Sequence, residues 1–304
     1  DHRGVDAARR PEPGDHQERR TVAGHRHRQL GPVGGPGAQF AHHPVFTLST
    51  VPRFFLPAGA LDGGSAVIEG ADAAHLARSL RARPGERVTV VDAGGVEHGL
   101  VLEEIGPTLA RGRVEWSRPA TGEPAARVHV LQALPAEGMD AAVEALAEVG
   151  AAEVWPVLTR RAVARPDPVR AARRVERWAA IAREAAALAG RAGPVPVHPP
   201  QPLAGALAAL PTGTRVLACS VGAAPPLASI SDDGRTLALV IGPEGGLAPE
   251  ELAEIRAAGG EEVHLGPRVL RARLAGAVAV GILLARLGDL DAAPAPPPRD
   301  PVRA

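Results

Sequence analysis

The sequence predicts an α/β protein in which a mainly parallel sheet follows a small β-barrel. Two observations support this. From residue 127 onward, short apolar runs alternate with segments of helical periodicity, as in folds where helices connect parallel strands. Before residue 120 the apolar runs are short, alternate with polar residues and are separated by turn signals, which favours an antiparallel barrel.

The barrel is expected over residues 51–120. Its predicted strands are RFFLP (53–57), ERVTVVDAGG (86–95), VEHGLVLEEI (96–105) and LARGRVEWS (109–117). A helix is predicted over 71–86, closed by Pro84 and Gly85. The Pro- and Gly-containing segment RPATGEP (118–124) marks the boundary of this domain.

The larger α/β domain is expected over residues 125–290. Strands are predicted at 127–134, 153–158, 215–220, 236–242 and 262–266, and helices at 139–150, 169–190, 249–258 and 275–287. This alternation is typical of a sheet with helices on its faces.

The two ends of the chain differ from these domains. Residues 1–50 hold six of the eleven histidines with repeated Gly and Pro, and they show neither helical nor strand periodicity. Such a segment buries too little apolar surface to offset its ordering entropy, so it is expected to be disordered or extraneous. A disordered tail is expected over 291–304.

Composition excludes several classes of protein. No run of 18 apolar residues is present, so no membrane association is expected. The single cysteine, Cys219, excludes an intrachain disulfide framework and a multi-cysteine zinc site, and no metal site is expected. A reducing, cytoplasmic location is the default expectation.

The charge pattern is informative although the formal net charge is zero, which argues against a protein that coats nucleic acid generally. Apart from histidine, every basic residue is Arg. Residues 160–191 contain nine arginines and three acidic residues. This stretch is either a solvated helix face or a surface that contacts phosphates.

The most informative motif is LALVIGPEGGLAPEEL (237–252), in which a buried strand runs into a Gly-rich turn and then a helix. The carboxyl ends of parallel strands are where α/β sheets place ligands. The helix opens with acidic residues, and neither a P-loop nor a GxGxxG pattern occurs, so a phosphate cradle is not favoured. An ordinary tight turn is the alternative. A second Gly-Pro turn in HLGPRVLRARLAG (264–276) favours a pocket between paired loops.

Together, IGPEGGL (241–247) and LGPRVLR (265–271) resemble the signature of the bacterial 16S ribosomal RNA uracil-N3 methyltransferases of the SPOUT superfamily. Further similar segments are HLARSLRARPGERVTVVDAGG (75–95), AVEALAEVGAAEVWPVLTRRAVAR (142–165) and RWAAIAREAAALAGR (177–191). The resemblance covers roughly residues 51–290 in the family's order.

This resemblance implies an α/β methyltransferase domain with a deep trefoil knot, preceded by a PUA-like barrel that helps to hold RNA. It implies a bent S-adenosylmethionine (S-adenosyl-L-methionine) among the knot loops, a homodimer, and 16S rRNA or the small ribosomal subunit as partner.

The resemblance also assigns residues by position. The cofactor loops are Ile241, Gly242, Pro243, Glu244, Gly245 and Gly246, and Leu265, Gly266, Pro267, Arg268, Val269 and Leu270. Cys219 and Ser220 are expected to form a third wall, although Cys219 could equally be a small core residue. Arg271 is the candidate catalytic residue that stabilises the uracil anion, while Glu244 either acts through water or braces its loop. The predicted RNA contacts are Arg53, Arg78, Arg81, Arg160, Arg161, Arg165 and Arg191.

Two departures from the family pattern concern substrate handling. The family usually places hydroxyl side chains after the second loop, but here Arg271 is followed by Ala272, Arg273, Leu274 and Ala275. The turn at residues 135–138 also lacks the family's basic residue. The alternatives are therefore a catalytically weakened paralogue that binds RNA and a related ribose 2′-O-methyltransferase.

Overall fold

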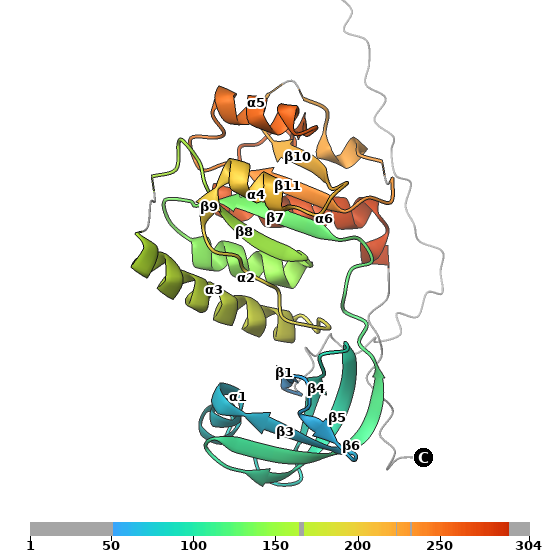
Figure 1. Ribbon diagram of the computed structural model, residues 1–304. Helices are drawn as coiled ribbons and strands as arrows, with labels where there is room; N and C mark the ends of the chain where they lie inside the picture. The colour runs from blue at the N-terminus through green and yellow to red at the C-terminus, as the bar shows by residue number, and fades with distance from the viewer. Residues whose placement is uncertain (1–50, 164–166, 223, 232, 292–304) are drawn as a thin grey trace, which may run out of the picture. The chain divides into compact units, whose positions relative to one another are not determined.

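The structure, a computed structural model, describes residues 51–163, 167–222, 224–231 and 233–291 (Figure 1). The expectations of disorder in residues 1–50 and 292–304 lie outside the described residues, as does Arg165.

The N-terminal region forms a six-stranded sheet with the strand order β1-β4-β5-β6-β3-β2. Its strands are β1 (Arg53–Phe55), β2 (Leu61–Asp62), β3 (Ser65–Glu69), β4 (Arg87–Val91), β5 (Val96–Ile105) and β6 (Leu109–Pro119). Every pairing in this sheet is antiparallel except that of β1 with β4. Alternate residues of the strands, among them Val88, Val90, Leu100 and Leu102, form a buried apolar core.

Two details of this region were predicted incorrectly. Strands β2 and β3 were missed, and the helix predicted over 71–86 ends earlier. The helical segment comprises α1 (Gly70–Ala74) and one π-helical turn (His75–Ser79). Arg81 then adopts a left-handed φ of 53°, which ends the helix before Pro84.

The second sheet also has six strands, in the order β12-β10-β11-β7-β8-β9, and all are parallel. They are β7 (Val128–Ala133), β8 (Glu153–Leu158), β9 (Gln201–Pro202), β10 (Arg215–Cys219), β11 (Leu237–Ile241) and β12 (Glu261–Val263). The prediction of an α/β fold with a mainly parallel sheet is thus confirmed. The short strand β9 was not predicted.

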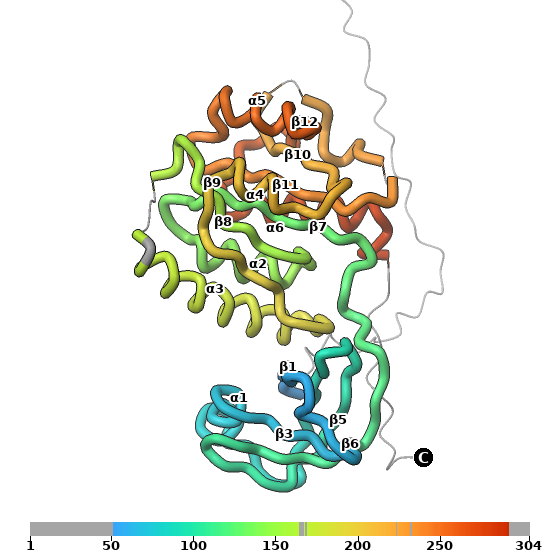
Figure 2. The backbone as a smooth tube through the Cα atoms, viewed as in Figure 1, coloured from blue at the N-terminus to red at the C-terminus, as the bar shows by residue number. Residues whose placement is uncertain are grey.

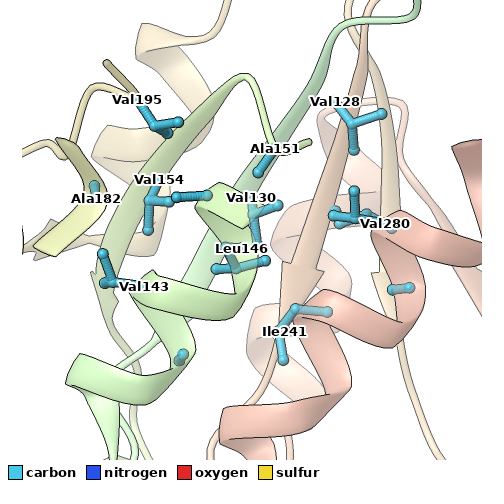
Figure 3. Close-up of a cluster of buried hydrophobic side chains, with 14 of the residues drawn as sticks. Val128, Val130, Val143, Leu146, Ala151, Val154, Ala182, Val195, Ile241 and Val280 are labelled. Atoms are coloured by element: carbon cyan, nitrogen blue, oxygen red, sulfur yellow. The ribbon is translucent and has the colours of Figure 1, made fainter. Parts of the chain in front are cut away.

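Helices cover both faces of this sheet (Figure 1). They are α2 (Met139–Val149), α3 (Pro168–Leu188), α4 (Leu203–Ala209), α5 (Pro249–Ala257) and α6 (Ala272–Arg286). On β11, Leu239 and Ile241 face the core shared with α2, α3 and α6, whereas Ala238 and Val240 face the core shared with α4 and α5. Figure 3 shows the first of these cores, where Val143 and Leu146 pack against the sheet. No helix among the described residues is long and apolar enough to cross a bilayer.

Local sequence explains where the two helices after β7 and β8 begin and end. Glycines with left-handed φ values flank α2: Gly138 at 81° and Gly150 at 110°. Helix α3 starts at Asp167, whose carboxylate accepts hydrogen bonds from the backbone N–H groups of Val169 and Arg170 at 3.1 and 3.0 Å. Helix α4 was missed by the sequence analysis.

Strand order determines where a ligand can bind. The chain passes outward from β7 to β8 and β9, returns to β10 on the other side, and then places β11 between β10 and β7 (Figure 2). The loops after β10, β11 and β12 therefore leave the same edge of the sheet side by side. A reversal of strand order of this kind opens a crevice at the carboxyl ends of the strands.

We expect the buried side chain of His129 to make the stability of this fold sensitive to acid. Its side chain on β7 is 1% exposed, and neither ring nitrogen has a hydrogen-bond partner among the described residues. Burial lowers the pKa of His129 below its ordinary value of 6.5, although the Glu153 carboxylate opposes the shift. As the pH falls through about 6.5, His129 therefore binds a proton in the unfolded chain but remains largely neutral in the folded chain.

We predict that the free energy of unfolding falls between about pH 7.5 and 5.5, where ordinary carboxylates remain charged. His129→Leu should flatten this dependence because it removes the titrating group. His75→Gln is the matched control, since His75 is exposed. Urea unfolding across this range measures the effect, and equal slopes for the wild type and His129→Leu would contradict it.

Candidate functional site

A cavity of about 940 Å³ lies at the carboxyl ends of β10, β11 and β12. Its walls are residues 219–222, 241–247 and 264–272, together with Arg161, Leu252, Glu262 and Ala275. All residues predicted to hold a cofactor therefore line one cavity, and Arg271 lines it with them. The two Gly-Pro turns of the sequence predict that these residues lie together. They do so because β10, β11 and β12 are parallel neighbours, and their loops leave the same edge of the sheet.

The loop after β11, residues 242–247, folds tightly back on itself. A Cβ atom on Gly242 would lie 3.0 Å from the backbone nitrogen of Leu247, so a larger residue would require the loop backbone to shift. Gly246 has a left-handed φ of 69°, and its N–H donates to the carbonyl of Pro243 at 2.8 Å. Gly245 differs, because a Cβ there would first meet the side chain of Arg161, at 3.3 Å. At its three glycines the loop thus has no side chain between its backbone and the cavity.

Three neighbouring contacts hold this loop in place. The Glu244 carboxylate accepts a hydrogen bond from the N–H of Ala136 at 3.2 Å, which attaches the loop to the turn after β7. Arg161 Nη1 donates to the carbonyl of Gly245 at 2.9 Å. Glu251, only 3% exposed, accepts from the N–H of Ala248 at 2.7 Å. The cavity wall is consequently fixed from several sides.

The wall formed by the end of β10 is largely uncharged. Burial raises the pKa of the Cys219 thiol to about 12, so the thiol stays protonated and is a poor nucleophile at neutral pH. The Ser220 hydroxyl is buried and has no hydrogen-bond partner among the described residues. An unpartnered buried hydroxyl beside a cavity is suited to a polar atom of a ligand.

His264 also lines the cavity and follows β12, the strand that pairs with β10. Its Nδ1 accepts a hydrogen bond from the N–H of Gly266 at 3.0 Å, which leaves the ring proton on Nε2. Glu262 lines the cavity two residues earlier, and its carboxylate pairs with Arg256 at 2.6 Å. Neither residue was predicted as a site residue, because the sequence gives no signal beyond their place near the end of a strand.

Positive charge gathers at the cavity from three exposed arginines, Arg161, Arg268 and Arg271. Arg271 occupies the N-cap position of α6, and its carbonyl accepts the first hydrogen bonds of that helix. The partial positive charge of a helix N-terminus therefore adds to that of its guanidinium. Against these arginines, Glu244 and Glu262 are the two acidic residues of the cavity. The site thus favours an anionic group beside these arginines.

The arginines predicted to contact RNA lie in different environments. Arg78, Arg81, Arg160 and Arg161 are exposed. Arg53 is paired with the buried carboxylate of Glu97 at 2.6 Å.

Arg191 is only 3% exposed and does not suit an RNA contact. It binds the Glu123 carboxylate at 2.7 Å and the carbonyls of Ala147 and Ala151 at 3.0 and 2.7 Å. Burial keeps it away from phosphates, so it serves the packing of this region instead.

Comparison with known proteins identifies the family of this chain. Residues 122–284 match the family model described as an RNA methyltransferase domain. The ribosomal RNA small subunit methyltransferase E of Mycobacterium tuberculosis is 37% identical over 227 residues, covering 72% of this chain and 86% of that protein. The enzyme of the same name from Bacillus subtilis is 27% identical over 222 residues, covering 68% of this chain and 85% of that protein.

A solved structure extends the similarity to three dimensions. The ribosomal RNA small subunit methyltransferase E from Neisseria gonorrhoeae, bound to S-adenosyl methionine, has a TM-score of 0.70 and 28% sequence identity. The alignment covers 79% of this chain and 98% of that one. The family resemblance predicted from the two Gly-Pro loops is therefore confirmed. The chain belongs to the RNA methyltransferase family that includes the ribosomal RNA small subunit methyltransferases E.

Proposed function

We propose that this protein transfers a methyl group from S-adenosylmethionine to N3 of a uridine in 16S rRNA of the small ribosomal subunit. The observation that carries the proposal is the single cavity lined by both Gly-Pro loops. The names of the relatives support the cofactor and the rRNA. The family resemblance of the sequence supports N3 as the methylated atom.

The described residues fit this cofactor. The glycine loop after β11 lets a ligand approach its backbone, and the Ser220 hydroxyl offers an unused hydrogen-bonding group. Residues 241–246 and 265–270, with Cys219 and Ser220, would hold it. When bound, the cofactor supplies an electrophilic methyl carbon for in-line displacement. The task of the protein is then to position the base and to stabilise charge.

Arg271 is the residue we assign to charge stabilisation. Uracil N3 must lose its proton during attack, so negative charge develops on the base. Arg271 lies in the cavity at the N-terminus of α6, where its guanidinium and the helix end both favour an anion. Glu244 braces its loop through the N–H of Ala136, which favours a structural role over that of a base.

The wider architecture follows from the same resemblance. We propose that the sheet at residues 51–120 is a PUA-like barrel that helps to hold RNA, and that residues 125–290 form a trefoil-knotted SPOUT domain. We also propose a homodimer acting in the cytoplasm. Three exposed apolar side chains support the dimer, because Val221, Val269 and Leu274 are 89%, 83% and 49% exposed at or beside the cavity.

The first prediction separates the methylated positions. Incubation of the protein and S-adenosylmethionine with small ribosomal subunits from cells that lack this modification should create a strong stop in primer extension. A methyl group on N3 blocks base pairing, whereas a ribose 2′-O-methyl group causes pausing mainly at low nucleotide concentration. A pause of the second kind would favour the ribose methyltransferase alternative. Cofactor and RNA binding without methyl transfer would favour the inactive paralogue.

The second prediction concerns the glycine loop. Gly242→Ala places a Cβ 3.0–3.2 Å from the backbone of Gly246 and Leu247, so the loop must shift, and overpacking of this kind costs about 1–3 kcal/mol, or roughly 5- to 150-fold in affinity. Calorimetry should show S-adenosylmethionine affinity reduced within that range while the protein stays folded. Gly193→Ala is the control, because Gly193 does not line the cavity, a Cβ there meets nothing within 4 Å, and the affinity should change by less than about twofold. Equal affinities for the two variants would place the cofactor elsewhere.

The third prediction tests Arg271. Removing a preorganised donor to developing negative charge lowers turnover by about 100- to 1000-fold. Arg271→Ala should do so in single-turnover methyl transfer while S-adenosylmethionine affinity stays within a few-fold of wild type. Arg273→Ala should matter less, because Arg273 packs beside Gly138 and does not line the cavity. A rate for Arg271→Ala close to that of Arg273→Ala would remove Arg271 from the mechanism.

A further inference from the structure

One buried carboxylate joins two segments that lie far apart in the sequence. The Oε2 atom of Glu251 accepts a hydrogen bond from the N–H of Ala248, at the end of the glycine loop, at 2.7 Å. Its Oε1 atom accepts from the N–H of Arg160, after β8, also at 2.7 Å. A change in the position of either segment would therefore change the position of the other through Glu251.

The chemical setting makes this bridge strong. Glu251 is 3% exposed, and each of its oxygens accepts a short hydrogen bond from a backbone amide. Glu251 also lies in the first turn of α5, where the helix end favours negative charge. A neutral amide at this position would keep only one good acceptor, so one of the two connections would be lost.

Arg161 provides a second link between the same two segments. Its guanidinium donates to the carbonyl of Gly245, and its aliphatic stem lies 3.3–3.9 Å from the position that a Cβ on Gly245 would take. The residue is nevertheless exposed and lines the cavity. Arg161 thus contacts the glycine loop, and because it is exposed to solvent it is also accessible to RNA.

We infer that Glu251 is a positioning residue that couples binding of the cofactor to binding of RNA through Arg160 and Arg161. This inference rests on the proposed function. A glycine loop ordered by the cofactor holds the arginine segment in its RNA-binding position through Glu251. Thermodynamic linkage then requires RNA to raise the affinity for the cofactor by the same factor.

The test measures this factor directly. The Kd of S-adenosylhomocysteine is determined by equilibrium dialysis without and with saturating small ribosomal subunits that lack the modification. We expect the wild-type Kd to fall at least about fivefold when the subunits are present. In Glu251→Gln the ratio of the two Kd values should approach one. Glu250→Gln, the exposed neighbour on the same helix, should keep the wild-type ratio.

The ratio distinguishes coupling from simple structural support. If Glu251 only stabilised the fold, Glu251→Gln would raise both Kd values by the same factor and leave their ratio unchanged. Arg161→Met gives a second test that does not disturb a buried group, because it removes an exposed guanidinium together with its contact to Gly245 and its proposed contact to RNA. It should also lower the ratio toward one. Its matched control is Arg173→Met, an exposed arginine of α3 that does not line the cavity and should preserve the ratio.

The outcomes separate this inference from the proposed function. A ratio of one between the two Kd values of the wild type overturns the coupling. A wild-type ratio retained in Arg161→Met also overturns it. Neither result contradicts the proposal of methyl transfer. If Glu251→Gln does not fold, Arg161→Met decides the question. Failure of the wild type to bind S-adenosylhomocysteine at all would instead overturn the proposed function.

Discussion

The site depends on the tight backbone turn that follows β11. Strand β11 lies between β10 and β7, and its loop must reverse immediately to reach α5. The reversal is possible because Gly242 has no side chain to meet the backbone of Leu247 and because Gly246 adopts a left-handed conformation. The same loop contacts the turn after β7 through Glu244 and the segment after β8 through Arg161. A few glycine conformations therefore organise several segments around one cavity.

The cavity has an uncharged wall at the end of β10 and three exposed arginines in its lining, and both features suit methyl transfer. Cys219 and Ser220 give a wall without formal charge, since burial keeps the thiol protonated. Arg161, Arg268 and Arg271 are exposed at the cavity, where they can meet an anionic partner. A cationic cofactor would be repelled by arginines packed around its sulfonium, so the neutral wall is the better place for it. This arrangement is consistent with our proposal that the arginines act on RNA and on the charge that develops on a base.

Sequence reasoning predicted the larger features well because they follow from periodicity. The predicted bounds of β5 and β8 match the structure, and the parallel sheet is confirmed. Short elements were missed, since β9 has two residues and α4 has seven, too few to show a period. Within the site, the two loops could be located from their motifs. Glu251 could not, because its role depends on a backbone N–H 91 residues away. Arg191 was assigned to RNA because its pairing with Glu123 is invisible in the sequence.

The segment after Arg271 shows how the departure from the family pattern is accommodated. Ala272 is 4% exposed, and its carbonyl accepts a hydrogen bond from the amide of Gln132 at 3.4 Å. One helical turn later, a Cβ on Gly276 would lie 2.9 Å from Oε1 of the buried Gln132 side chain and 3.2 Å from Cδ2 of Leu146, so glycine lets α6 lie close to β7 without moving these side chains. Small residues along this edge thus let the helix pack against the sheet. The absent hydroxyls remove possible contacts in the cavity, but this packing fixes the backbone that holds Arg271 at the start of α6. The charge stabilisation that we propose for Arg271 therefore does not require those hydroxyls.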